Sequence, residues 1–247
     1  KRLLYVVDAR QALHLRMVFE TARRAGWIGP DVEVQHVAFG TVLGADGRPF
    51  KTRAGDAVPL SALFQGAIEK ARLTVSGRDG QHRAADVDVL AREVGIGAVK
   101  YADLATSRTK DYVFDLDRMV SLSGNTGVYL QYAHARVRSI LRRLAEDGGA
   151  PELPGEVSLQ PSERALALLL DDFARTVIEV GRTLEPHRLC TYLYSLSQAF
   201  TDFYESCPVL RAESAELRAV RTLLCSLTAD TLQRGLELLG IAAPARL

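Results

Sequence analysis

A strand-helix-strand pattern at the start of the sequence is the feature that most constrains the fold. Residues 3–7 form an uninterrupted apolar run rich in β-branched side chains, which is typical of a strand buried on both faces. Apolar residues then recur every three or four positions over residues 11–27, as on a helix, and residues 32–39 are predicted as a second strand. Two parallel strands are too few for an independent sheet, so we expect part of an α/β domain. Because the sequence opens inside the first strand and without a methionine, we also expect the native protein to begin upstream.

Most of the remaining sequence is predicted to be helical. The helices expected before residue 147 cover residues 59 to about 71, 86–94, 96–104 and 127 to about 146. Gly95 and Gly97 are predicted to form a turn between the second and third of these, and Tyr112 begins a short strand. A linker rich in Gly and Pro is expected at about 147–157. The amphipathic helices that follow it predict an all-α bundle, and they cover residues 166–180, 186–204 and 217–239.

Charge and cysteine content exclude several classes of protein. The 247 residues carry a net charge of +1, which argues against a uniformly basic nucleic-acid coat and against an acidic tail. Residues 1–150 hold 22 Lys and Arg against 17 Asp and Glu, whereas residues 151–247 hold 9 against 13, so a polyanion would meet mainly the first part. Three cysteines without C-x-x-C spacing argue against a disulfide framework or a zinc site and favour a reducing compartment. No segment has the roughly 20 apolar residues of a membrane span.

Polar residues gather where the first predicted strand passes into its helix. Asp8, Gln11 and His14 lie in this junction. In open parallel sheets ligands bind beyond the carboxyl ends of the strands, and a helix N-terminus there favours an anion. The junction therefore predicts a site for a small polar ligand. The alternative is that Asp8 only caps the helix.

A second polar group, Phe50-Lys51-Thr52-Arg53, follows a glycine-rich turn. Two cations with a hydroxyl between them suit a triphosphate or its leaving pyrophosphate, because cations stabilise the charge that develops in phosphoryl or adenylyl transfer. The alternative is a solvated basic loop. The five histidines show no metal-binding spacing, and no G-x-S-x-G nucleophile motif occurs.

Ordered segments spread over essentially the whole chain resemble one known family. They are residues 5–14, 37–44 with 50–55, 99–104, 112–117, 129–136, 203–210, 235–241 and 244–247. In this order they resemble the C-terminal half of arginyl-tRNA synthetase, a class I aminoacyl-tRNA synthetase. The resemblance implies a partial Rossmann-type parallel catalytic fold over residues 1–115, with nucleotide-loop and stem-contact regions, and a helical anticodon-binding domain over residues 116–247.

The resemblance also implies an activity and its partners. Such an enzyme activates arginine with ATP, with Mg²⁺ expected in the full-length protein, and transfers the arginyl group to the 3′ end of arginine tRNA. We expect it to act in the cytoplasm, without a structural metal and without DNA or a membrane as a partner. By position, the resemblance assigns arginine and ATP contacts to Tyr5, Asp8, Gln11, His14, Phe39 and Gly40.

Several of these positions receive a specific role from the resemblance. Gln11 would contact arginine, His14 would lie near ATP or the adenylate, and Phe39 and Gly40 would border the adenine. The catalytic loop that stabilises pyrophosphate would contain Lys51, Thr52 and Arg53. This loop departs from the usual Lys-Met-Ser-Lys-Ser pattern, with Pro49 at the first lysine and Thr52 at the second, so no single catalytic cation is assigned.

Part of the family's catalytic machinery is absent from the sequence. The motif His-Ile-Gly-His, the acidic residues that hold the arginine guanidinium and a domain that touches the tRNA elbow belong to the N-terminal half. A site that lacks half of its ligands cannot position two reactants. We therefore expect these 247 residues alone to be catalytically inactive.

Arginine and tyrosine residues predict contacts with RNA. Arg136 and Arg138 lie on one predicted helix with Arg142 and Arg143, and Tyr129 and Tyr132 precede them. Arginine suits phosphates and tyrosine suits unstacked bases, although a solvated helix face is the alternative. Further candidates lie in the bundle, where core packing is the alternative for the two tyrosines: Arg188, Tyr192 and Tyr204.

Two other functions stay open at this point. A non-catalytic, tRNA-binding paralogue of the synthetase would keep the bundle without activating arginine. A helical protein-interaction module could use the same scaffold, although no specific residue supports it. An upstream His-Ile-Gly-His motif would separate the enzyme from the paralogue.

Overall fold

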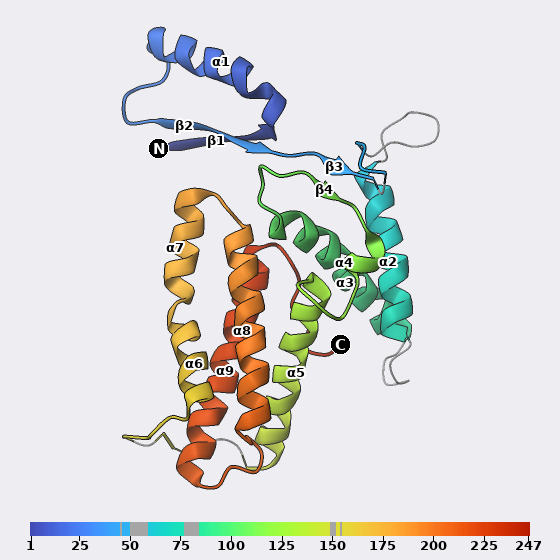
Figure 1. Cartoon of the computed structure of the whole chain (residues 1–247), viewed down its shortest axis with the longest axis vertical. Coiled ribbons are helices and arrows are strands. Elements are labelled where there is room, and N and C mark those ends of the chain that lie inside the picture. The colour runs from blue at the N-terminus through green and yellow to red at the C-terminus, as the bar shows by residue number, and fades with distance from the viewer. Residues whose placement is uncertain (45, 50–58, 77–83, 149–151, 154) are drawn as a thin grey trace. The chain divides into compact units, whose positions relative to one another are not determined.

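The computed structural model describes residues 1–44, 46–49, 59–76, 84–148, 152–153 and 155–247 (Figure 1). The chain forms two compact units. The first unit comprises Lys1–Val58 and Thr106–Asp115, and the second comprises Pro59–Ala105 and Leu116–Leu247. Strands and one helix in the first unit, together with helices in the second, confirm the predicted combination of an α/β part and an all-α part.

The first unit is built on two parallel strands, β1 (Arg2–Asp8) and β2 (Glu33–Phe39). A short 3₁₀ helix, η1 (Ala9–Gln11), leads into α1 (Ala12–Arg24), which lies along one face of the strand pair (Figure 1). Phe19 of α1 is buried, and its ring centroid lies 4.9 Å from that of Tyr5 on β1. The strand-helix-strand prediction is therefore confirmed.

The expected burial of β1 on both faces is wrong for the described part of the chain. Tyr5 and Val6 are 43% and 62% exposed. Among the described residues of the first unit, β1 pairs only with β2 and α1 is the helix that packs on this pair, so within this unit the other face of the sheet carries no helix.

A second parallel pair completes the first unit. The two-residue strand β3 (Val42–Leu43) follows β2 closely and pairs with β4 (Tyr112–Val113). This confirms the short strand predicted at Tyr112. The pairing brings residues 106–111 to the end of β2, although about 70 residues separate the two segments in the sequence.

The second unit begins with a pair of helices, α2 (Leu60–Ser76) and α3 (Ala84–Ala105), followed by the short α4 (Leu116–Met119). The predicted turn at Gly95 and Gly97 is wrong, because α3 is continuous through both residues. A Cβ atom at Gly95 would lie 2.7 Å from the Ile68 backbone of α2, and one at Gly97 would lie 2.9 Å from Gln131 Nε2. These glycines therefore permit close helix packing, which outweighs their poor helix propensity.

The remaining helices lie side by side as a bundle (Figure 1). They are α5 (Gly127–Glu146), α6 (Pro161–Asp171), α7 (Phe173–Thr183), α8 (His187–Ser206) and α9 (Ala215–Leu238). The predictions for α5, α8 and α9 are confirmed to within a few residues. The single helix predicted over residues 166–180 is wrong, because the helix breaks at Asp172. At this break the Leu169 carbonyl accepts a hydrogen bond from the Tyr192 hydroxyl at 2.8 Å, which competes with the regular ladder.

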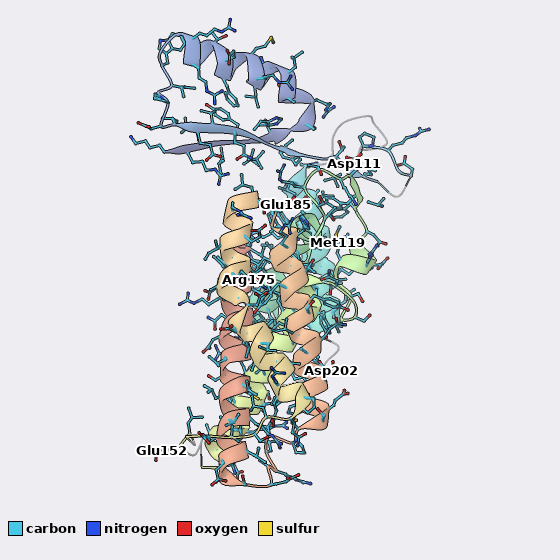
Figure 2. All side chains as sticks on the ribbon, turned by 60° about the vertical axis from the view of Figure 1, so that its left-hand side comes forward. Asp111, Met119, Glu152, Arg175, Glu185 and Asp202 are labelled. Atoms are coloured by element: carbon cyan, nitrogen blue, oxygen red, sulfur yellow. The ribbon has the colours of Figure 1, made fainter. Side chains whose placement is uncertain are left out.

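The bundle has a continuous apolar core, and side chains fill the space between its helices (Figure 2). Leu130, Leu193 and Leu232 are completely buried there, on α5, α8 and α9 respectively. Cys190, Cys207 and Cys225 are buried in the same core as free thiols.

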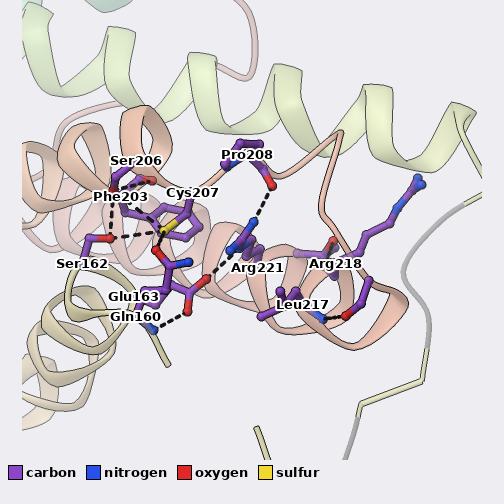
Figure 3. Close-up of polar contacts among 12 residues, drawn as sticks. Gln160, Ser162, Glu163, Phe203, Ser206, Cys207, Pro208, Leu217, Arg218 and Arg221 are labelled. Carbon is purple, nitrogen blue, oxygen red and sulfur yellow. Dashed lines mark hydrogen bonds and ion pairs between the residues drawn. The ribbon is translucent and has the colours of Figure 1, made fainter. Parts of the chain in front are cut away.

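A buried ion pair joins the start of α6 to α9 (Figure 3). Glu163 Oε1 and Arg221 Nε are 2.6 Å apart, and the two side chains are 0% and 1% exposed. Arg221 Nη1 also donates to the Pro208 carbonyl at 2.8 Å, and Glu163 Oε2 accepts the Gln160 N–H at 2.8 Å in a capping box. The pair therefore links α6, the α8–α9 connection and α9.

Candidate functional site

The carboxyl ends of β1 and β2 form one edge of the sheet. The parallel register pairs Asp8 with Phe39, as expected from the positions of the two residues at the ends of their strands. Asp8 accepts the Arg10 N–H at 2.8 Å, and both of its oxygens bond to the Arg10 guanidinium at 2.9 and 2.8 Å. The side-chain and backbone hydrogen bonds from Arg10 lower the pKa of Asp8 to about 2. Asp8 therefore caps η1 as a carboxylate at physiological pH.

The other candidates beside β1 have exposed polar groups. Gln11 is the N-cap residue of α1 and makes no side-chain capping bond, so its amide is not used by the helix. His14 lies in the first turn of the same helix and is exposed. Tyr5 packs its ring against Phe19 and remains 43% exposed. A helix N-terminus with these side chains can bind a polar, negatively charged ligand.

The end of β2 is held by a loop that the sequence did not point to. Arg108 Nη1 donates to the Ala38 carbonyl at 2.9 Å, and the Gly40 N–H donates to the Arg108 carbonyl at 2.7 Å. Asp111, labelled in Figure 2, accepts the Thr41 N–H through Oδ1 at 2.6 Å. Phe39 remains 42% exposed at the sheet edge. The sequence signals for this contact are weak, namely a glycine directly after a strand and a distant charged loop.

The catalytic candidates Lys51, Thr52 and Arg53 lie outside the described residues. Within the described part of the chain, no three His, Cys, Asp or Glu side chains are grouped to hold a metal ion. At the sheet edge Asp8 has both oxygens bonded to Arg10, so it does not provide an open ligand set for Mg²⁺. None of the described helices is long and apolar enough to cross a membrane.

Four of the RNA-contact candidates lie where α5 meets α8. Tyr129, Tyr132 and Arg136 are spaced along one face of α5, and each is half-buried. The Arg136 guanidinium lies 5.2 Å from the centre of the Tyr204 ring on α8, in a cation–π contact. Tyr129 meets Tyr194 of α8 edge to face at 5.6 Å. We call Tyr129, Tyr132, Arg136 and Tyr204 the aromatic-arginine face.

The remaining RNA-contact candidates have structural partners. Arg138 donates to Asp230 at 2.9 Å and to Gln233 at 2.7 Å, so it joins α5 to α9. Tyr192 is only 7% exposed and packs in the bundle core, and its hydroxyl donates to the Leu169 carbonyl at 2.8 Å. Arg188 bonds Glu185 at 2.5 Å. The structure therefore brings only part of the predicted set together on one face.

A groove of about 680 Å³ lies between α7 and α8, and Arg188 lines it. Arg175, labelled in Figure 2, is the other arginine in the lining, and it pairs with Asp172 at 2.5 Å. Glu179 adds a further carboxylate. Because the cations of the groove are matched by acids, the groove does not form a basic patch for a polyanion.

Comparison with known families separates the chain into two matched regions. Residues 1–116 match the model for the class I tRNA synthetase (R) catalytic domain, and residues 130–247 match the DALR anticodon-binding domain. An arginine–tRNA ligase of Frankia casuarinae is 64% identical over 246 residues. The chain belongs to the arginyl-tRNA synthetase family. This confirms the resemblance found in the sequence.

Other members of the family match over the same span. The arginine–tRNA ligase of Streptomyces coelicolor is 54% identical and covers 99% of the chain. The structure of Thermus thermophilus arginyl-tRNA synthetase matches 99% of the chain, with a TM-score of 0.86 and 34% sequence identity. The structure of the Plasmodium falciparum enzyme matches the whole chain, with a TM-score of 0.82 and 30% sequence identity. The chain spans 41% of the length of the Frankia relative and 41% of each of these two solved chains.

Proposed function

We propose that this chain is the C-terminal part of an arginine–tRNA ligase that acts in the cytoplasm. The observation that carries the proposal is the ordered match to a catalytic and an anticodon-binding domain, with 64% identity to an arginine–tRNA ligase over the whole chain. In this reaction an arginine carboxylate oxygen attacks the α-phosphorus of ATP, and pyrophosphate leaves. The tRNA 3′-terminal hydroxyl then attacks the arginyl carbonyl, and AMP leaves.

The proposed division of labour follows the two matched regions. Residues 1–115 supply part of the catalytic domain, and residues 116–247 supply the anticodon-binding domain. At the sheet edge Gln11 contacts arginine, His14 lies near ATP, and Phe39 and Gly40 border the adenine. Lys51, Thr52 and Arg53 stabilise the pyrophosphate. When bound with ATP, Mg²⁺ would neutralise phosphate charge.

The aromatic-arginine face supplies the proposed contact with arginine tRNA. A guanidinium beside tyrosine rings can bind a phosphate while the rings stack on unpaired bases. Arg136 is the cation of this face, and its guanidinium lies over the Tyr204 ring. Arg138 is not included among the proposed tRNA contacts, because its guanidinium donates to Asp230 and Gln233 of α9.

Binding of arginine tRNA to the 247-residue chain tests this proposal. We expect tighter binding than to an unrelated tRNA at moderate salt, with the preference lost when the anticodon is changed. Arg136→Ala should weaken binding to both tRNAs and reduce the salt slope by about one unit for one lost phosphate contact. Arg182→Ala is the matched control, because Arg182 is exposed on α7 and pairs with Glu179. Equal affinity of the unmodified chain for arginine tRNA and for the unrelated tRNA would contradict the proposal.

The non-catalytic paralogue remains the alternative function. It predicts the same tRNA binding, so binding does not distinguish it from the ligase. Charging of arginine tRNA by the full-length enzyme distinguishes them, because a paralogue without the first nucleotide motif would attach no arginine. By full-length enzyme we mean the native protein that contains these 247 residues, with its own preceding region.

A further inference from the structure

The loop that precedes β4 fixes the backbone at the end of β2 from three points. Arg108 Nη1 donates a hydrogen bond to the Ala38 carbonyl at 2.9 Å. The Arg108 carbonyl accepts one from the Gly40 N–H at 2.7 Å. Asp111 Oδ1 bonds the next N–H, that of Thr41, at 2.6 Å. We call Arg108 and Asp111 with these three contacts the β2 brace.

The brace leaves the segment from Ala38 to Thr41 little freedom. A Cβ atom at Gly40 would lie 2.5 Å from the Lys110 carbonyl oxygen and 2.8 Å from Asp111 Oδ1, so the loop packs directly on the Gly40 backbone. Arg108 is half-buried, which strengthens its hydrogen bond to the Ala38 carbonyl. Phe39 lies between Ala38 and Gly40, and its side chain is 42% exposed. Its direction is therefore set by the braced backbone.

We infer that Arg108 and Asp111 are positioning residues of the ATP site. This inference rests on the proposed function, in which Phe39 and Gly40 border the adenine. Both residues act through the backbone, so their contribution requires no contact with ATP. A displacement of about 1 Å in a positioned group can lower catalytic efficiency about a hundredfold. Gln11, the proposed arginine contact, follows β1 and not β2, so loss of the brace should affect ATP more than arginine.

Charging kinetics of the full-length enzyme test this inference, with ATP and arginine varied separately. Arg108→Gln and Asp111→Ala should each raise the KM for ATP about tenfold, as for loss of a hydrogen bond with a charged partner, and leave the KM for arginine within about twofold. Asp111→Asn should restore a KM for ATP near that of the wild type, because its side-chain oxygen can still accept the Thr41 N–H. Arg23→Gln is the control for loss of an arginine charge, since Arg23 is exposed on α1.

The outcomes separate this inference from the proposed function. Wild-type charging with an unchanged KM for ATP in Arg108→Gln and Asp111→Ala overturns the positioning role. Equal rises in the two KM values, no recovery in Asp111→Asn, or unfolding of both variants at the assay temperature would also overturn it, because each indicates a general structural role. Failure of the wild-type enzyme to charge arginine tRNA would instead contradict the proposed function.

Discussion

Single side chains fix the backbone of segments that are distant in the sequence. His134 is a clear case, because its Nδ1–H donates to the Pro244 carbonyl at 3.0 Å while its Nε2 accepts from Arg138 Nε at 3.2 Å. Both ring nitrogens are therefore satisfied only in the neutral ring. Burial is the main cause that lowers the pKa of His134 below its usual value, and the bond to Pro244 opposes it. Arg138 on α5 adds to the lowering, whereas Asp230 and Glu237 on α9 oppose it.

The lowered pKa of His134 predicts a pH-dependent stability. The unfolded chain binds a proton at this residue as pH falls through about 6.5, whereas the folded chain resists protonation, so the contribution is complete above that pH and decreases below it. Urea unfolding of the 247-residue chain at pH values from 7.5 to 5 should show this loss. His134→Asn, whose amide can donate to Pro244 without titrating, should lose less stability over the same range. Parallel curves for the two proteins would contradict the assignment.

Some contacts of single residues could be predicted from the sequence, and others could not. The pairing of Asp8 with Phe39 could be predicted, because parallel strands place their carboxyl ends at one edge. Arg108 and Asp111 could not, because their contacts with Ala38 and Thr41 bridge about 70 residues and leave no periodic pattern. Arg138 and Tyr192 have residue types suited to RNA, and only the packed bundle shows their internal partners.

At the scale of elements, packing between helices decides where they continue and where they break. Gly95 and Gly97 were predicted to end a helix on local propensity, and the close approach of α2 and α5 to α3 keeps them inside it. At Asp172 a contact between helices instead accompanies a break, because the Tyr192 hydroxyl of α8 donates to the Leu169 carbonyl of α6. Neither partner is close in sequence, so local reasoning missed both.

Alanine substitutions at two helical glycines test the packing argument. Gly95→Ala should destabilise the chain by about 1–3 kcal/mol, because its Cβ meets the Ile68 backbone at 2.7 Å and forces α2 and α3 apart. A Cβ atom added at Gly181 on α7 has no neighbour within 4 Å. Gly181→Ala should therefore stabilise the chain by about 0.5–1 kcal/mol, because alanine has the higher helix propensity. Urea unfolding measures both values. Stabilisation by Gly95→Ala would show that α2 and α3 are not in close contact.

The buried pair Glu163–Arg221 gives a second test at this scale (Figure 3). Arg221→Met should cost about 3–5 kcal/mol, because Glu163 then remains buried without its cation. The double variant Glu163→Leu with Arg221→Met should recover much of this loss, since an apolar pair avoids the desolvation of two ions. Denaturant unfolding of the three proteins measures the coupling. Additive losses in the double variant would contradict the pairing.

At the scale of the molecule, the second unit combines a dense bundle with thiols that solvent does not reach. Cys190, Cys207 and Cys225 are each 0% exposed, and burial raises the pKa of Cys190 and of Cys225 to about 12. A buried thiol that stays protonated is a poor nucleophile.

The three thiols should therefore report on unfolding of the second unit. With a chromogenic disulfide reagent at pH 8, we expect no rapid modification of the folded chain and reaction of all three thiols in urea. The rate in native buffer should follow the opening of the bundle. Fast reaction of even one thiol in the folded chain would contradict the described core.

The central claim is that this chain is part of an arginine–tRNA ligase, and charging of tRNA tests it most directly. The full-length enzyme should attach radiolabelled arginine to arginine tRNA in the presence of ATP and Mg²⁺. The 247 residues alone, assayed in parallel, should attach none, because they span 41% of the Frankia relative. An absence of arginylation by the folded full-length enzyme, or attachment of a different amino acid, would contradict the account.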